Sequence, residues 1–266
     1  DPRSSEMESL HLTLCQCSLV WESPETNRRN IELLLCKEVV EQTDLILLPE
    51  MFTTGFSMHS DKLAESMDGP TVSWMQAMAD RFGAAIAGSL IICDGGRYFN
   101  RLVFVRPGNP AIDTYDKRHR FTLAGEHEHF DAGTRRCISS WKSWNIAWYI
   151  CYDLRFPVWS RNVEAADLMV YVANFPAKRA RAWNGLLPAR AIENQSYVAG
   201  VNRTGTDGKG LEYQGDSAVY DFEGRPLLHM AAREGLQTIC LSHPELENFR
   251  NEFPFLRDRD AFGGIT

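Results

Sequence analysis

Hydrophobic residues recur along the chain with two different spacings, which predict strands and amphipathic helices in alternation. The segment 10–21, LHLTLCQCSLVW, alternates in the manner of a strand, with leucines on one face. Ser23 and Pro24 follow as an N-cap and a first-turn proline. They open a predicted helix whose apolar residues recur at helical spacing: Ile31, Leu34, Leu35 and Val39.

The next segments continue this alternation and add a hairpin. The run DLILLPE, residues 44–50, predicts a short buried strand. A second helix is predicted over residues 71–82, with Gly83 directly after its last turn. Residues 84–93 and 98–105 then flank the turn DGGR, and this arrangement predicts two antiparallel strands.

The rest of the chain predicts more strands, in the segments NIAWYIC, DLMVYVAN, QSYVAGVN, SAVYD and RPLLHMAA. Hairpins mixed with strand–helix units predict an α/β fold in which helices pack on mixed sheets. No linker rich in proline, glycine or serine divides the chain, so residues 7–266 are expected to form one domain. Residues 1–6, DPRSSE, look like a remnant of an expression vector.

Composition narrows the class of protein. A formal charge of −7 argues against a nucleic-acid or anionic-membrane surface, and no apolar stretch has the length of a membrane span. The chain shows no charged-then-apolar leader, so we do not expect secretion. Its seven cysteines are scattered without a C-x-x-C pair, which is typical of buried thiols in a reducing compartment. We therefore expect a cytoplasmic protein.

Cys151 is the first residue that could carry chemistry. It ends the apolar segment NIAWYIC, and Pro157 is placed to start a following helix. A cysteine between a strand end and a helix N-terminus lies near unpaired N–H groups, which would stabilise a thiolate. The main-chain N–H of Tyr152 would then help to hold a developing oxyanion. The alternative is a buried cysteine that only packs, and the local sequence favours neither.

Glu50 and Lys117 also follow predicted strands. Glu50 comes after LILLP and beside Met51, Phe52 and Phe56, where poor solvation would raise the pKa of its carboxyl into the range useful for proton transfer. Lys117 could stabilise an oxyanion and lower the pKa of a nearby thiol. The alternatives are a solvated carboxylate for Glu50 and, since Lys117 lies in the charge run DKRHR, an exposed surface lysine.

The segment GEHEHFDAG, residues 125–133, carries two histidines and two glutamates. His127 and His129 suggest a metal site, but this is not H-E-x-x-H and no third ligand stands in an expected place. A carboxylate that serves a nearby site is the better functional interpretation of Glu126. Each of these signals is weak alone, but Glu50, Lys117 and Cys151 all follow predicted strands. Together they indicate a site, because α/β folds gather catalytic groups at the carboxyl ends of strands.

Five motifs in order resemble the carbon–nitrogen hydrolase (nitrilase) superfamily: LLPEMFTTGF, YDKRHRF, GEHEHFDAG, CYDLRFPVWSRN and ARAIENQSYVAGVNRTG. The similarity runs from about residue 10 to about residue 255, and it is greatest to the bacterial ω-amidase-like branch. The resemblance implies an α/β fold built as a four-layer α-β-β-α sandwich of two mixed sheets, which pairs through a helical face into a homodimer.

The resemblance also implies a Glu–Lys–Cys triad, carried onto Glu50, Lys117 and Cys151, with Glu126 as a second glutamate. The activity it implies is hydrolysis of an amide by a cysteine thioester, with a small-molecule amide and water as partners. No metal or organic cofactor is expected. In this interpretation Cys151 is the nucleophile, and Lys117 and the Tyr152 N–H hold the oxyanion.

The implied substrate is the monoamide of a short dicarboxylate, such as α-ketoglutaramate, so a cation should meet the distal carboxylate. The sequence cannot choose among Arg155, Lys178, Arg179 and Arg203, and Arg155 could instead pair with Asp153 or Glu126. Phe52 and Phe175 are further candidates for the substrate pocket. An N-carbamoyl amide hydrolase or a general aliphatic amidase stays open, as do a zinc hydrolase that uses the two histidines and a non-catalytic binding protein.

Overall fold

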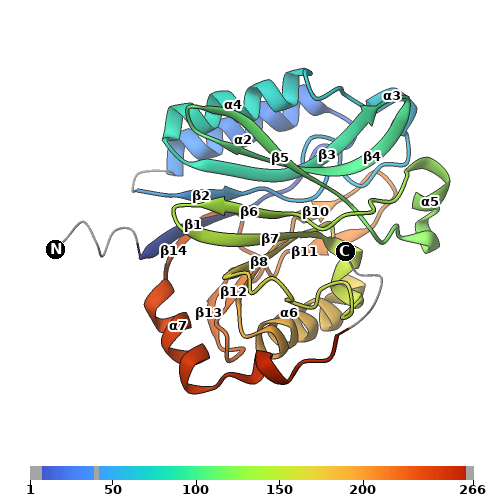
Figure 1. The fold of residues 1–266 in the computed structure, drawn as a ribbon. Coiled ribbons are helices and arrows are strands. Elements are labelled where there is room, and N and C mark those ends of the chain that lie inside the picture. Colours follow the sequence, from blue (N-terminus) through green and yellow to red (C-terminus); the bar gives the residue numbers. More distant parts are fainter. Residues whose placement is uncertain (1–7, 39–41, 262–266) are drawn as a thin grey trace.

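Two six-stranded sheets lie face to face in the computed structural model, which describes residues 8–38 and 42–261 (Figure 1). Helices cover the outer face of each sheet, so the layers run α-β-β-α. This confirms the expected four-layer sandwich. The suspected vector remnant at residues 1–6 and the predicted helical position Val39 lie outside the described residues.

The first sheet has the strand order β14-β1-β2-β3-β4-β5. Its strands are β1 (Ser9–Gln16), β2 (Leu45–Leu47), β3 (Ala85–Asp94), β4 (Arg97–Arg106), β5 (Asn109–Asp116) and β14 (Gly235–Ser242). The neighbours β1, β2 and β3 pair in parallel, and the other pairs are antiparallel. This sheet places the carboxyl ends of β2 and β5, which precede Glu50 and Lys117, at the site.

The second sheet repeats this arrangement with the order β13-β12-β9-β8-β7-β6. Its strands are β6 (Ile138–Trp141), β7 (Trp144–Ile150), β8 (Leu168–Val172), β9 (Tyr197–Val201), β12 (Ala218–Tyr220) and β13 (Pro226–His229). The central strands β7, β8 and β9 are parallel, and both flanks are antiparallel. Central parallel strands buried on both faces explain why their sequences are continuous apolar runs rather than alternating ones.

Apolar side chains from both sheets form one core cluster between the layers, where the rings of Phe104 and Trp148 lie 5.0 Å apart. Helices α2 (Pro24–Glu38) and α4 (Pro70–Phe82) pack on the outside of the first sheet, and α6 (Ala180–Asn194) and α7 (His243–Glu252) cover the second (Figure 1). None of the described helices is long and apolar enough to cross a membrane.

Shorter elements connect the layers and surround the site. They are the helical turns α3 (Ser60–Leu63) and α5 (Glu126–His129), the 3-10 turns Thr122–Ala124, Cys151–Arg155, Ala177–Arg179 and Phe255–Asp258, and the small hairpin β10–β11 (Thr204–Thr206 and Glu212–Gln214). The glycine-rich segment 203–215 therefore forms a hairpin.

The predicted elements agree with the structure except after Cys151. The helix over 71–82 is α4, and Gly83 ends it in the left-handed conformation with φ of 60°. The hairpin around DGGR is β3–β4. The predicted helix after Cys151 is wrong, because only the 3-10 turn Cys151–Arg155 forms and the next α-helix is α6. Pro157 follows that turn instead of starting a helix.

Candidate active site

Four polar side chains from two sheets meet at one edge of the sandwich. Glu50 lies shortly after β2, Lys117 directly after β5, Cys151 directly after β7, and Asn174 shortly after β8. Each stands at the carboxyl end of its strand, and the facing sheets bring these ends together. The structure thus joins the three predicted residues Glu50, Lys117 and Cys151, and adds Asn174.

The Glu50 carboxylate is fully buried and accepts hydrogen bonds on both oxygens. Its Oε1 accepts from Asn100 Nδ2 at 2.8 Å and from Lys117 Nζ at 2.9 Å, and its Oε2 accepts from the main-chain N–H of Asn174 at 2.8 Å. The side-chain amide of Asn174 also donates to the main-chain oxygen of Glu50. All of these partners are donors, so the site is built around an ionised carboxylate.

Lys117 lies between two carboxylates rather than on the surface, although its charge run suggested exposure. Its side chain is 1% exposed, and Nζ lies 2.9 Å from Glu50 Oε1 and 2.9 Å from Glu126 Oε2. Burial opposes its charge, but the negative charges of Glu126 and Glu50 outweigh this and raise the pKa of Lys117 above its usual range. Lys117 therefore stays a cation.

Glu126 is buried as well, at the first position of the helical turn α5. Its Oε2 accepts from Lys117 Nζ and, at 3.1 Å, from the main-chain N–H of Phe121, while its Oε1 has no partner. Burial raises the pKa of Glu126, with Lys117 acting in the opposite direction. Glu126 is therefore a direct neighbour of Lys117.

Cys151 adopts an unusual backbone conformation at the end of β7. Its φ is +42°, in the left-handed region that residues other than glycine rarely occupy. The side chain is 9% exposed, and Sγ donates to the main-chain oxygen of Asn174 at 3.7 Å. The sharp turn therefore directs the thiol out of the core and towards the residue that also holds Glu50.

The surroundings of Cys151 favour its neutral thiol. Burial, followed by the charge of Glu50, raises the pKa of Cys151 well above its usual value, although Lys117 lowers it. The expected helix dipole is missing because no α-helix begins there. Cys151 must therefore lose its proton to a neighbouring base before it can attack.

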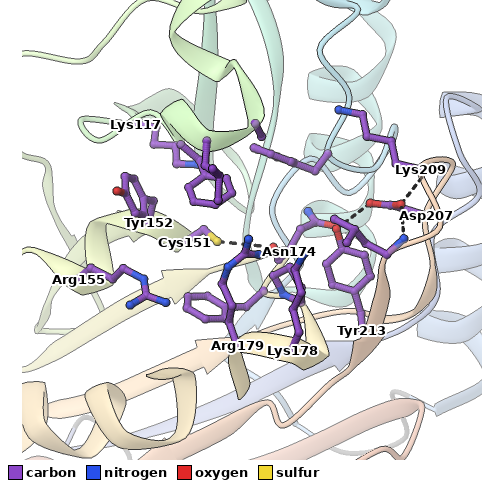
Figure 2. Close-up of a pocket in the computed structure, with 17 residues that line it drawn as sticks. Lys117, Cys151, Tyr152, Arg155, Asn174, Lys178, Arg179, Asp207, Lys209 and Tyr213 are labelled. Atoms are coloured by element: carbon purple, nitrogen blue, oxygen red, sulfur yellow. Dashed lines mark hydrogen bonds between the residues drawn. The ribbon is translucent and has the colours of Figure 1, made fainter. Parts of the chain in front are cut away.

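A cavity of about 210 Å³ opens above Cys151 (Figure 2). Besides Cys151 and Lys117, its lining includes apolar side chains from several loops: Phe56, Phe121, Leu123, Tyr152, Phe175 and Leu211. In Figure 2, Lys117 and Tyr152 lie on one side of Cys151, and the hairpin residues Asp207, Lys209 and Tyr213 lie on the opposite side. The β10–β11 hairpin therefore forms one wall of the cavity.

Four cationic side chains besides Lys117 line this cavity: Arg155, Lys178, Arg179 and Lys209. Arg155 lies over the ring of Phe175 at 5.8 Å, and Arg179 over Phe121 at 4.9 Å. The alternative that Arg155 pairs with Asp153 or Glu126 is wrong: among the ion pairs of the described residues, Asp153 pairs with His119 and Glu126 with Lys117. Arg155 and Arg179 are thus available to an anion.

Two other residues considered for the substrate do not line the cavity. Phe52 is fully buried on the outer face of the first sheet, against Gly88 and Trp74, because the tight turn at Met51 sends it back over β3. Arg203 is also fully buried, lies over the Tyr213 ring and donates to main-chain oxygens. Phe175, in contrast, does line the cavity, as expected.

His127 and His129 lie on the exposed turn α5, and neither lines the cavity above Cys151. Within residues 8–38 and 42–261, no group of three or more histidine, cysteine, aspartate or glutamate side chains is arranged to hold a metal ion. The geometry therefore does not favour the zinc alternative.

A cysteine and a lysine thus line one cavity, and a buried glutamate is bonded to that lysine. A family model described as carbon-nitrogen hydrolase matches residues 11–248. The chain belongs to the carbon–nitrogen hydrolase family. This places its enzymatic class: a hydrolase of the nitrilase superfamily, with an amidase-type site around a cysteine.

Individual relatives support this placement along the whole chain. The omega-amidase YafV of Escherichia coli (strain K12) is 44% identical over 257 residues, which cover 96% of this chain and 99% of that protein. The 2-oxoglutaramate amidase of Bacillus subtilis (strain 168) is 30% identical over 93% of this chain and 96% of that protein. The crystal structure of XC1258 from Xanthomonas campestris, a CN-hydrolase superfamily protein with an arsenic adduct in its active site, matches with a TM-score of 0.92 and 46% identity over 96% of this chain and 98% of that one.

Sequence reasoning missed several residues of this carbon–nitrogen hydrolase site. Asn174 ends the apolar segment DLMVYVAN, so the rule that singled out Glu50 and Cys151 would also have found it. Asn100 lies within β4, and no local pattern marks it. Asp207 and Tyr213 reach the cavity only because the hairpin folds over it, which the sequence does not show.

Proposed function

We propose that the protein is an ω-amidase that releases ammonia from a short dicarboxylate monoamide such as α-ketoglutaramate, through a thioester on Cys151. The observation that carries this proposal is the cavity itself: a cysteine with a buried Glu–Lys pair at its base and several cations around it. The activities named for the E. coli and B. subtilis relatives agree with this substrate class.

In the first half of the reaction, Glu50 acts as general base for the thiol and Cys151 attacks the amide carbon. The tetrahedral oxyanion accepts hydrogen bonds from Lys117 Nζ and the main-chain N–H of Tyr152. One such donor contributes about 10²–10³ in rate. Glu50 then passes its proton to the departing ammonia, and the C–N bond breaks to leave an acyl thioester on Cys151.

In the second half, water attacks the thioester with Glu50 as base, and the same donors hold the second oxyanion. The carboxylic acid leaves as Cys151 recovers its proton. Glu126 positions Lys117 through their 2.9 Å contact. Every step uses residues of this chain and water, without a metal or organic cofactor.

The distal carboxylate of the substrate is assigned to the cations of the cavity. Arg155 and Arg179 are the preferred partners because a guanidinium matches a carboxylate with two parallel hydrogen bonds. Phe175 supplies an apolar wall for the short methylene chain. An N-carbamoyl amino acid also carries a carboxylate, so an N-carbamoyl amide hydrolase with the same triad is the alternative.

Ammonia release tests the proposal. Wild-type protein and Cys151→Ala are assayed in parallel with α-ketoglutaramate, succinamate, glutamine and an N-carbamoyl amino acid, with and without a chelator. We expect release from the keto-amide that the chelator does not affect and that the variant lacks. Turnover of the carbamoyl compound alone would mean that the protein is an N-carbamoyl amide hydrolase instead. Full activity of Cys151→Ala would overturn the mechanism.

We further propose that the chain acts as one domain, as a homodimer and in the cytoplasm. The seven cysteines are all free thiols, which supports a reducing compartment. Light scattering on the purified protein tests the dimer. A monomer that retains full ammonia release would contradict the proposed homodimer.

A further inference from the structure

Asp153 lies two residues after Cys151 and is the most highly bonded carboxylate of the site. Its side chain is fully buried, yet it does not line the cavity. Oδ1 accepts from the main-chain N–H of His119 at 3.0 Å and lies 2.7 Å from the Nδ1 of the same histidine. Oδ2 accepts from the hydroxyl of Tyr115 at 2.6 Å and from the main-chain N–H of Ile150 at 3.0 Å.

These partners have a specific relationship to the catalytic residues. Tyr115 and His119 stand two residues before and two residues after Lys117, and Ile150 directly precedes Cys151. One carboxylate therefore binds the chain on both sides of the lysine and next to the cysteine. The two segments come from different sheets, since Lys117 follows β5 and Cys151 follows β7.

We propose that Asp153 is a positioning residue that fixes Cys151 relative to Lys117. It does not touch the substrate; it holds the sharp turn at Cys151 and the chain around Lys117 in one frame. This inference rests on the proposed function, because it concerns the placement of that nucleophile and that oxyanion donor.

The surroundings of this network are rigid. The His119 ring stacks on Phe156 with centroids 3.8 Å apart, and the Tyr115 hydroxyl accepts from Trp159 Nε1 at 2.9 Å. Burial and the nearby charge of Asp153 raise the pKa of Tyr115, so its hydroxyl remains a donor. The unusual φ of Cys151 can persist only where its surroundings are over-determined in this way.

Only a carboxylate satisfies this arrangement, because each of its oxygens faces a main-chain N–H. In Asp153→Asn, the new amide group must face either the N–H of His119 or that of Ile150, and neither main-chain group can become an acceptor. An asparagine therefore places two donors against each other in either orientation. The isosteric change shifts the turn without emptying the space.

A matched control is available at the other end of β7. Asp167 is also a buried carboxylate, and its Oδ2 accepts from the main-chain N–H of Asn145 at 2.8 Å, near the amino end of the strand. Asp167→Asn removes the charge of a buried carboxylate that also pairs with Arg250 and His243, outside the cavity. It should reduce stability without changing the placement of Cys151.

The test compares wild type, Asp153→Asn and Asp167→Asn, each shown to be folded by circular dichroism at the assay temperature. For the keto-amide we expect Asp153→Asn to lower kcat about 10- to 100-fold with KM within about threefold, since small misplacement of reacting groups has effects of this size. Asp167→Asn should keep wild-type kcat. Equal kcat in wild type and Asp153→Asn, or equal losses in the two variants, would overturn the proposal.

A second readout needs no substrate. The rate at which iodoacetamide alkylates Cys151, followed by mass spectrometry of its peptide, should fall several-fold in Asp153→Asn because Lys117 no longer supports the thiolate. If wild type hydrolyses none of the amides, the proposed function fails while this readout still decides the positioning role. If Asp153→Asn does not fold, Tyr115→Phe replaces it, since this variant removes one hydrogen bond to Asp153. Wild-type values of both kcat and alkylation rate in Tyr115→Phe would overturn the proposal.

Discussion

The ammonium of Lys117 and the carboxylate of Glu50 are joined at 2.9 Å in a fully buried environment. The pair links an oxyanion donor to a general base, so a change to either residue alters both roles. Their third partner, Cys151, has a raised pKa that Glu50 increases and Lys117 decreases.

Glu50→Gln should slow ammonia release and at the same time make Cys151 easier to ionise. Loss of a general base lowers kcat by about 10²–10⁴. Removing the charge of Glu50 lowers the pKa of Cys151, so the pH profile of its alkylation by iodoacetamide moves to lower pH. Parallel measurements of kcat and of alkylation between pH 6 and 10 check this. An unshifted profile would mean that Glu50 does not control the thiol.

Lys117→Met should destabilise the protein in a pH-dependent way. The substitution leaves Glu50 and Glu126 buried without their cation, and breaking such a buried pair costs about 3–5 kcal/mol. Burial already raises the pKa of Glu126, and Lys117 is the group that lowers it. A carboxyl group whose pKa is raised in the folded protein stabilises the fold at low pH. This stabilisation is lost as the pH rises through that pKa. The deficit in unfolding free energy should therefore be larger at pH 8 than at pH 5, as measured by urea denaturation. The same deficit at both values would contradict the assigned charges.

Arg179→Gln should weaken the binding of substrates that carry a carboxylate. We expect KM for the keto-amide to rise about tenfold or more, equivalent to about 1.4 kcal/mol, with a smaller effect on kcat. Arg155→Gln should act in the same direction, while Lys62→Gln on α3, outside the cavity, serves as a control. For an amide without a carboxylate, such as butyramide, the Arg179 variant should equal wild type. Equal losses for both substrates would exclude a carboxylate contact.

The sequence predicted most strands and both long helices before residue 83, because apolar periodicity and turn residues are local signals. The four-layer sandwich was implied by the resemblance to carbon–nitrogen hydrolases. Positions at strand ends made Glu50, Lys117 and Cys151 candidates, and the family resemblance joined them as a triad. Sequence reasoning failed where position depends on tertiary packing: Phe52 faces the outer helices rather than the cavity, and Arg203 is buried. The helix expected after Cys151 does not form there, and burial raises the pKa of its thiol.

Trapping the acyl-enzyme tests most directly whether hydrolysis proceeds through a thioester on Cys151. Wild-type protein is mixed with α-ketoglutaramate, quenched in acid within one turnover, and digested for mass spectrometry. We expect an acyl adduct on the peptide that contains Cys151, with ammonia released in equal amount, and neither in Cys151→Ala. Ammonia release at the wild-type rate without any adduct, or from the variant, would contradict the thioester mechanism.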